Sequence, residues 1–131
     1  MPIDKSSLAM FTGTEEWTRW NRLLFPNMVM TDGVKYVAEN GGGHGAYWLL
    51  DAIGSYQRKL LKTQAMREMQ IWTLKVNLSN HTCVLTCQAD SDKPAVVTQK
   101  IECTDFDLDE MTIWVMPMDE TIYTLLLPSE Y

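Results

Sequence analysis

Residues 70–89, QIWTLKVNLSNHTCVLTCQA, decide the fold that this sequence predicts. Apolar and polar residues alternate through both halves of the stretch, which is the pattern of strands with one buried face. A two-residue turn at Ser79-Asn80 gives a hairpin whose turn and hydrophobic pattern agree on one register. The apolar residues then pair on one face: Trp72 with Cys87, Leu74 with Leu85 and Val76 with Cys83.

Three more alternating segments follow this hairpin. They cover residues 97–103, 111–115 and 123–127, and an acidic loop at 105–110 separates the first two. Strands joined by short links usually lie beside their neighbours in sequence. The sequence therefore predicts an antiparallel five-stranded meander over residues 70–131.

The chain before this sheet has helical periodicity. Thr12 or Thr14 can cap a first helix, since Thr12 with Glu15 forms a capping box, and Pro26 ends it. Three apolar residues recur along the segment at helical spacing: Trp17, Trp20 and Leu24. We expect these three side chains to form one buried stripe.

Two further helices are expected before residue 70. The second begins at Thr31, which can act as its N-cap, and ends at residues 40–41, Asn-Gly. A glycine-rich loop at 41–45, GGGHG, leads into the third, which ends between residues 59 and 69. The buried face of the third helix is marked by residues spaced four, three and four positions apart: Leu49, Ile53, Tyr56 and Leu60.

These elements predict one α+β domain, residues 1–131, in which N-terminal helices pack on one face of a C-terminal antiparallel five-stranded meander sheet. Residues 1–69 are mostly helical and residues 70–131 are mostly strand. With 131 residues, 46% of them hydrophobic and 21% charged, the chain is of ordinary size and composition for one globular domain. The longest apolar run, residues 46–50, is far too short to cross a membrane.

Charge is distributed unevenly along the chain. Residues 1–70 carry eight basic and seven acidic side chains, whereas residues 71–131 carry three basic and ten acidic ones, for a net charge of -6 overall. Nucleic-acid binding is not expected, because it requires a large basic surface. The densest basic run is interpreted as the solvated face of a helix end: Arg58, Lys59, Lys62 and Arg67.

The three cysteines are interpreted as reduced thiols in a cytoplasmic protein, because no secretory leader is visible at residues 1–7. Cys83 and Cys87 have a spacing that suggests zinc, but four residues of strand separate them by about 13 Å, too far for one metal ion. We interpret both as small core residues. A disulfide between Cys83 and Cys103 is geometrically allowed if the turn between their strands places them opposite each other. No cofactor or metal is expected.

The glycine-rich loop and its histidine are the most unusual local feature. The loop lacks the Lys-Ser or Lys-Thr pair of a P-loop and follows a helix instead of a strand, so we interpret it as a connector. His44 lies close to a helix N-terminus, where a neutral imidazole is favoured and can act as a base or a ligand. Asp32 and Asp51 on the flanking helices are candidate partners of His44.

The outward face of the predicted sheet carries a candidate interface. Trp114 points away from the neighbouring inward residues Ile113 and Val115. Together with Met116 and Ile122 it forms an apolar patch on the face that the helices leave open, and such patches mark interfaces. The hypothesis is a homodimer through this face.

Several segments resemble a family of short bacterial proteins of unknown function, DUF6876. The segments are residues 11–14 (FTGT), 31–39 (TDGVKYVAE), 45–53 (GAYWLLDAI), 72–76 (WTLKV), 103–106 (CTDF) and 127–131 (LPSEY). In that family the glycine segment is shorter and has no histidine, which weakens a catalytic role for His44. The resemblance implies no activity, but its motif residues gather around the second and third helices: Asp32, Tyr36, Tyr47, Trp48 and Asp51.

Since no catalytic motif stands out, the favoured function is a small cytoplasmic, non-enzymatic binding or regulatory module. Its partner would be another protein or a second copy of the chain rather than a small molecule. One alternative is a hydrolase or transferase, which requires Asp32, His44 and Asp51 to converge in a pocket. Another is an acidic decoy of a nucleic-acid-binding protein, which requires carboxylates along one face.

Overall fold

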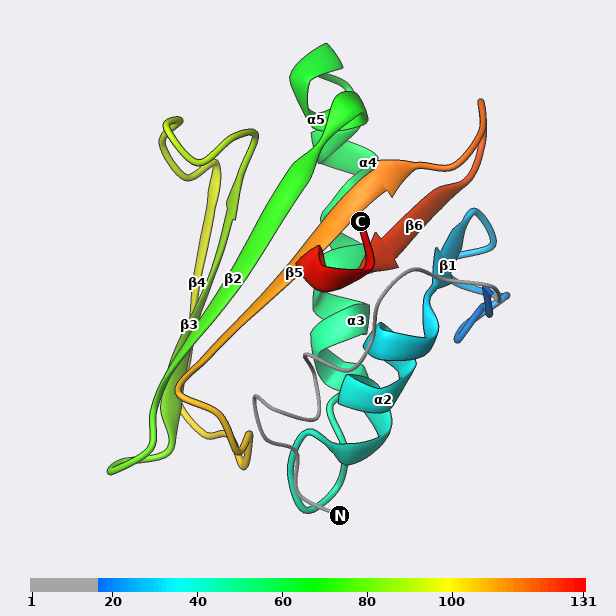
Figure 1. The fold of residues 1–131 in the computed structure, drawn as a ribbon. Helices are drawn as coiled ribbons and strands as arrows, with labels where there is room; N and C mark the ends of the chain where they lie inside the picture. Colours follow the sequence, from blue (N-terminus) through cyan, green and yellow to red (C-terminus); the bar gives the residue numbers. More distant parts are fainter. Residues whose placement is uncertain (1–16) are drawn as a thin grey trace.

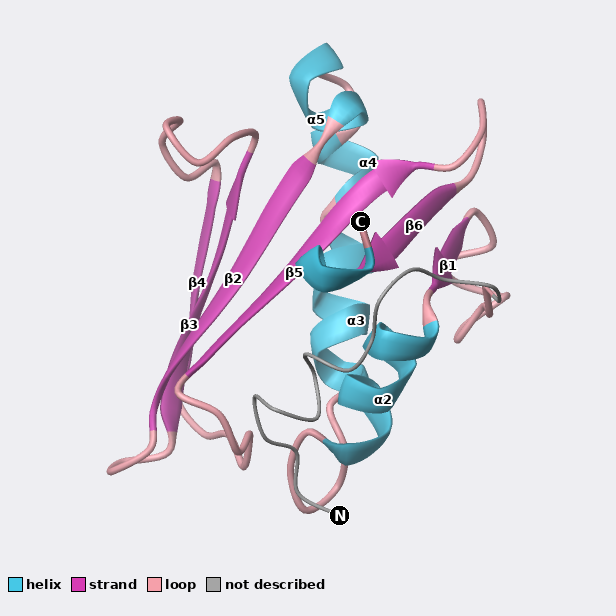
Figure 2. Cartoon of the chain, in the orientation of Figure 1, coloured by secondary structure: helices cyan, strands magenta, loops and turns pink. Residues whose placement is uncertain are grey.

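The computed structural model describes residues 17–131, which form a mixed sheet and a set of short helices (Figures 1 and 2). The elements are β1 (Met28–Met30), α2 (Asp32–Asn40), α3 (Tyr47–Ser55), α4 (Gln57–Leu60), α5 (Gln64–Glu68), β2 (Gln70–Asn77), β3 (Thr82–Gln88), β4 (Val97–Ile101), β5 (Glu110–Pro117), β6 (Tyr123–Leu126) and the 3-10 turn η1 (Pro128–Glu130). The α+β class is confirmed. The predicted number and order of strands are not.

The β2–β3 hairpin has the predicted register. Its apolar residues pair as expected: Trp72 with Cys87, Leu74 with Leu85 and Val76 with Cys83. The turn is longer than the predicted two residues, because β2 ends at Asn77 and β3 begins only at Thr82. His81 closes this turn with a positive φ of 59°. The register survives the longer turn because the buried face determines it.

The predicted meander is wrong, because the strand order is β1-β6-β5-β2-β3-β4. After β4 the chain crosses back, and β5 pairs antiparallel with β2, so that Trp72 lies opposite Ile113. The pattern of burial explains this order. β5 has buried or half-buried residues along most of its length and needs a neighbour on each side, whereas β4 keeps Thr98 and Lys100 exposed at the edge.

The predicted first helix is also wrong in its described part. Thr18 forms an antiparallel bridge with Met30, and β1 then pairs in parallel with β6, which makes the sheet mixed. Trp17 and Leu24 are 45% and 66% exposed, so they form no buried stripe. All three residues of β1 are buried. The burial gained when β1 joins the edge of the sheet is therefore more favourable than the helix that the spacing of residues 17–24 predicts. The predicted capping residues, 12–15, lie outside the described residues.

The second predicted helix is present, whereas the third is divided. α2 begins as expected, with the Thr31 hydroxyl accepting the Val34 N–H at 3.3 Å. The third is interrupted near Tyr56 and again before α5, although its predicted inward residues are all buried or half-buried. In Figure 1, α3 and α4 lie behind the sheet while η1 crosses in front of β5, so the helical segments are not confined to one face. Among residues 17–131, no helix has the length and apolar character to span a bilayer.

Two glutamine side chains form a polar cluster in the core, between α4 and β2. The amides of Gln57 and Gln70 donate to each other's oxygens, both at 2.8 Å, and the Trp72 indole N–H donates to Gln70 at 2.9 Å. Their remaining N–H groups reach the carbonyls of Ile53 and Met66. Because these buried groups are paired, the cluster fixes α4 against the central strand.

Glu130 joins the end of the chain to the first turn of α2. Its carboxylate is 5% exposed and accepts hydrogen bonds from the Thr31 hydroxyl at 2.6 Å, the Gly33 N–H at 3.1 Å and the Leu127 N–H at 3.0 Å. A negative charge is favourable at a helix N-terminus. A Cβ on Gly33 would lie 2.5 Å from this carboxylate, so the glycine permits the close approach.

Candidate functional site

The three residues of the catalytic alternative do not converge. Asp32 begins α2 and His44 follows its far end; nine helical residues separate the two ends by about 13 Å. Asp51 accepts a hydrogen bond from the Trp20 indole at 3.1 Å. Asp32 and His44 are therefore too far apart to act on one group, and Asp51 is engaged with Trp20.

Neither of the two predicted tyrosines is among the residues that line the two concavities described below. Tyr36 is half-buried and packs against the core, where its backbone carbonyl accepts a hydrogen bond from the Asn40 side chain. Tyr47 is 38% exposed at the start of α3. Partial burial, together with the nearby charge of Glu39, raises the pKa of the Tyr47 hydroxyl.

Two of the predicted residues, His44 and Trp48, do line the same groove, which has a volume of about 750 Å³. Three connections meet there, at the lower end of the molecule in Figure 1: the α2–α3 loop, the β2–β3 turn and the β4–β5 loop. Because both histidines of the chain lie along it, we call it the histidine groove. Its lining residues are His44, Gly45, Trp48, Leu78, His81, Cys103, Thr104, Asp105, Phe106 and Asp107.

Asp105 holds the glycine-rich loop against the β4–β5 loop. Its Oδ2 atom accepts the backbone N–H of His44 at 3.2 Å. Gly42 has a φ of 133°, and a Cβ there would lie 2.5 Å from Oδ1 of Asp105. A glycine is therefore required at this position. The glycine-rich loop connects α2 to α3, and the carboxylate that its backbone binds is that of Asp105 in the same chain.

The β4–β5 loop is anchored on two sides. The Thr104 N–H donates to the His81 carbonyl at 2.7 Å, which joins the loop to the β2–β3 turn. Phe106, which is 2% exposed, packs on Gly41 so closely that a Cβ there would lie 2.7 Å from the ring. Phe106 thus anchors the acidic β4–β5 loop.

Asp107 lines the groove, and one of its carboxylate oxygens is unsatisfied. Its Oδ2 atom is buried and has no hydrogen-bond partner within residues 17–131. Trp48, half-buried, and Leu78, 48% exposed, add aromatic and apolar surface nearby. Carboxylates beside an aromatic ring are the groups that bind guanidinium or ammonium ions in proteins.

The cysteines are free thiols. Cys83 and Cys87 are buried on β3 and Cys103 is exposed at the histidine groove. Burial raises the pKa of Cys87 to about 12. It also raises that of Cys83, although a hydrogen bond with Thr104 opposes the shift. Within the described chain, no group of three or more His, Cys, Asp or Glu residues could hold a metal ion.

The predicted interface residues Trp114, Met116 and Ile122 are all half-buried. Trp114 packs edge-to-face on Tyr131, with ring centroids 5.7 Å apart, and Tyr131 itself is 81% exposed. The apolar surface at this face is therefore shared between Trp114 and the end of the chain.

The carboxylates of the second half do not share one face. Asp90 and Asp92 lie in the β3–β4 loop, at the opposite end of the sheet from the acidic β4–β5 loop (Figure 1). Glu130 is buried beneath α2. The structure thus lacks the single acidic face that the decoy hypothesis requires.

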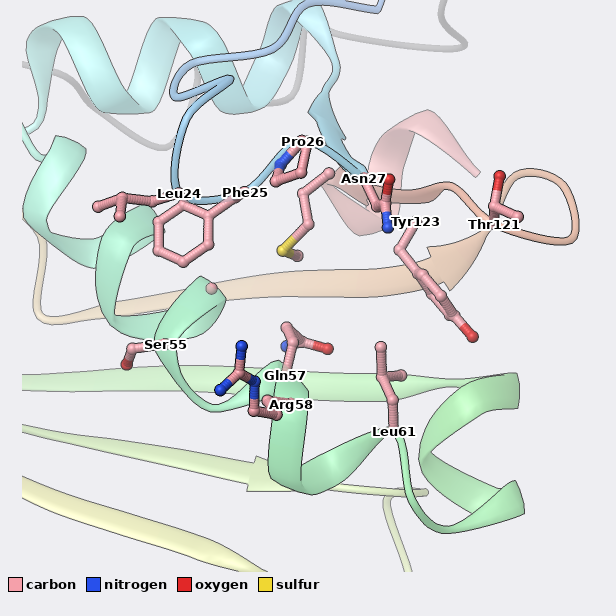
Figure 3. A pocket seen from close by; sticks show the side chains of 12 residues that line it. Leu24, Phe25, Pro26, Asn27, Ser55, Gln57, Arg58, Leu61, Thr121 and Tyr123 are labelled. Atoms are coloured by element: carbon pink, nitrogen blue, oxygen red, sulfur yellow. The ribbon is translucent and has the colours of Figure 1, made fainter.

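A second concavity, of about 410 Å³, lies between residues 24–28 and the α3–α4 junction (Figure 3). No sequence motif pointed to it, because its residues come from three separate segments, 24–28, 54–61 and 121–123. Arg58 lines this concavity. In the sequence it is part of a basic run that is typical of a solvated helix face. Likewise, Asp107 and His81 in the histidine groove come from loops whose meeting depends on the strand order.

Comparison with known proteins places the chain in a family but gives it no function. Neither the curated proteins nor the solved structures include a match. A family model described as a family of unknown function (DUF6876) matches residues 3–131, nearly the whole chain. This match agrees with the resemblance carried by its separate segments, and the chain therefore belongs to the DUF6876 family.

Proposed function

We propose that this chain is a non-enzymatic binding module that takes a basic segment of a protein partner into the histidine groove. The observation that carries the proposal is the buried, unpartnered Oδ2 atom of Asp107. A buried acceptor without a donor is costly, and an incoming N–H group would remove that cost. Trp48 offers the incoming cation the face of an aromatic ring.

The charge around the groove supports a cationic partner. Residues 101–131 contain eight carboxylates and no lysine or arginine. Five of these carboxylates belong to residues 102–110, in and next to the β4–β5 loop. Complementary charge speeds encounter and sets specificity more than it adds affinity, so we expect binding that weakens with salt.

A location in the cytoplasm is part of the same proposal, and the free thiols support it. Cys103 is exposed, and Cys83 and Cys87 are buried without a disulfide. Free thiols are typical of a reducing compartment.

A dye-labelled tetra-arginine peptide tests the proposal by fluorescence anisotropy, with tetra-glutamate as the charge control. Asp107→Asn removes the charge in the groove and keeps the shape of the side chain. Asp92→Asn makes the same change of charge in the β3–β4 loop, far from the groove. We expect Asp107→Asn to weaken binding about fivefold, and Asp92→Asn by less than about 1.5-fold. Equal losses in the two variants would show attraction by net charge alone and would refute the groove.

A second copy of the chain is the alternative partner. The Trp114 and Tyr131 pair favours it, because the exposed ring of Tyr131 packs on Trp114 of the candidate face. Native mass spectrometry of the purified protein reads the subunit count directly. A dimer that Trp114→Ala converts to a monomer would support self-association through this face, and a monomer at micromolar concentration would exclude it.

A further inference from the structure

The second concavity has the construction of a small-molecule site, and we call it the Arg58 pocket. Its size, about 410 Å³, lies within the range of ligand pockets. Figure 3 shows Phe25 on one side, Leu61 and Tyr123 toward the other end, and Arg58 reaching from α4 toward Phe25. The pocket is separate from the histidine groove and shares no lining residue with it.

The apolar walls of this pocket are built into the core. Met28, on β1, is 5% exposed. Phe25 packs directly on the backbone of α3, since a Cβ on Gly54 would lie 2.8 Å from its ring. Trp20 also packs on Phe25, with ring centroids 5.8 Å apart. These contacts hold the wall in place without a ligand, so little ordering is required on binding.

Two of the polar side chains at the pocket, Gln57 and Ser55, are already engaged within the fold. The Gln57 amide is bound to Gln70 and to the Ile53 carbonyl. The Ser55 hydroxyl donates to the Ala52 carbonyl at 2.7 Å. Arg58 differs from both, because its guanidinium forms no hydrogen bond or ion pair within residues 17–131. Arg58 is exposed at the pocket, and a guanidinium without a partner is available to a ligand.

We propose that the Arg58 pocket binds a small carboxylate with an apolar body. The carboxylate would take two parallel N–H bonds from the Arg58 guanidinium, a geometry that arginine offers and lysine does not. The apolar body would lie against Phe25, Met28 and Leu61. Leu24, which is 66% exposed at the same pocket, would be covered by the ligand.

Octanoate, octan-1-ol and octyltrimethylammonium test this proposal, because they share one apolar chain and differ only in the head group. Each is titrated into the protein by isothermal titration calorimetry. We expect octanoate to bind at one site per chain, at least about fivefold more tightly than octan-1-ol. The ammonium compound should bind most weakly. Absence of binding by octanoate, or equal affinities for all three probes, would overturn the proposal.

Three variants test whether Arg58 makes the head-group contact. Arg58→Gln should weaken octanoate about fivefold and leave octan-1-ol unchanged, whereas the neighbouring Lys59→Gln, with the same change of charge, should leave both unchanged. Arg58→Lys keeps the charge without the paired N–H bonds, so we expect a loss of about two- to threefold. If Lys59→Gln weakens octanoate as much as Arg58→Gln does, the carboxylate is held by general charge, and the assignment is wrong.

Discussion

Replacing Glu130 with alanine removes a carboxylate that is 5% exposed and accepts three hydrogen bonds, from Thr31, Gly33 and Leu127. A hydrogen bond to a charged group contributes about 1.5–3 kcal/mol, and neighbouring bonds are not additive. The substitution also leaves two N–H groups without an acceptor, one of them in the first turn of α2. We therefore expect the free energy of unfolding to fall by about 3–4 kcal/mol.

Urea denaturation followed by tryptophan fluorescence measures this loss. Unfolding entropy is about 2.1 cal/mol/K per residue, so a loss of 3 kcal/mol in a chain of this length lowers Tm by about 10 °C. Glu130→Gln keeps an acceptor oxygen without the charge, and we expect about half the effect. A loss below about 1 kcal/mol in Glu130→Ala would show that the contact is not formed in solution.

Gly33→Ala tests the same contact from the other side. A Cβ at Gly33 would lie 2.5 Å from Oε1 of Glu130 and 2.7 Å from Cδ1 of Leu127. In the wild-type background we expect this substitution to cost about 2 kcal/mol, the usual range for overpacking. In a Glu130→Ala background most of the clash is gone, so the two losses should fall short of their sum by at least about 1 kcal/mol. Additive losses would refute the direct contact.

Four further predictions follow from the core and the loops. Gln70→Leu leaves the partners of this amide unpaired in the core and should cost about 3 kcal/mol in urea denaturation; an unchanged midpoint would show that the cluster is not closed. A thiol reagent at pH 8 should label Cys103 alone in the native protein and all three cysteines in denaturant. Burial raises the pKa of Cys87 from 9.0 to about 12, so above pH 9 the unfolded chain loses a proton that the native chain retains. Stability should therefore fall as pH rises from about 9 to 12, and a constant stability across this range would contradict the burial. Gly42→Ala should cost about 2 kcal/mol because of its positive φ, whereas the matched Gly43→Ala should cost less than about 1 kcal/mol, as Tm measurements can show.

The part of the fold that could be predicted is the part that depends on residues close together in the sequence. Alternation through residues 70–89 determined which face of the hairpin is buried, and with it the pairing of Trp72 with Cys87. The partner of β5 could not be found in this way, because alternation shows that a strand is buried and not which strand lies beside it. Residues 17–24 show that helical spacing alone does not determine structure. Their apolar residues fit a helix, but the neighbouring β1 buries more surface by pairing with β6 in the sheet.

The candidate site was predicted only in part for the same reason. His44 and Trp48 were singled out by the glycine-rich loop and by the segment that resembles the family, and they do line one groove. Asp107 and His81 arrive there from loops that the strand order brings together. Arg58 carried no signal at all in the sequence, because an arginine in a basic run is normally solvated.

The two proposed sites lie at opposite ends of one helix. Trp48 lines the histidine groove from the first turn of α3, and Gly54 lines the Arg58 pocket from its last turn. The inner face of this helix is fully buried, with Ile53 at 0% exposure, so α3 cannot shift without disturbing a close-packed core. We therefore expect ligand binding at one proposed site to leave the affinity of the other unchanged, since α3 offers no room for a shift that both sites could share. The two proposed sites also differ in charge: Asp107, from the acidic half of the sequence, lines one, and Arg58, from the basic half, lines the other.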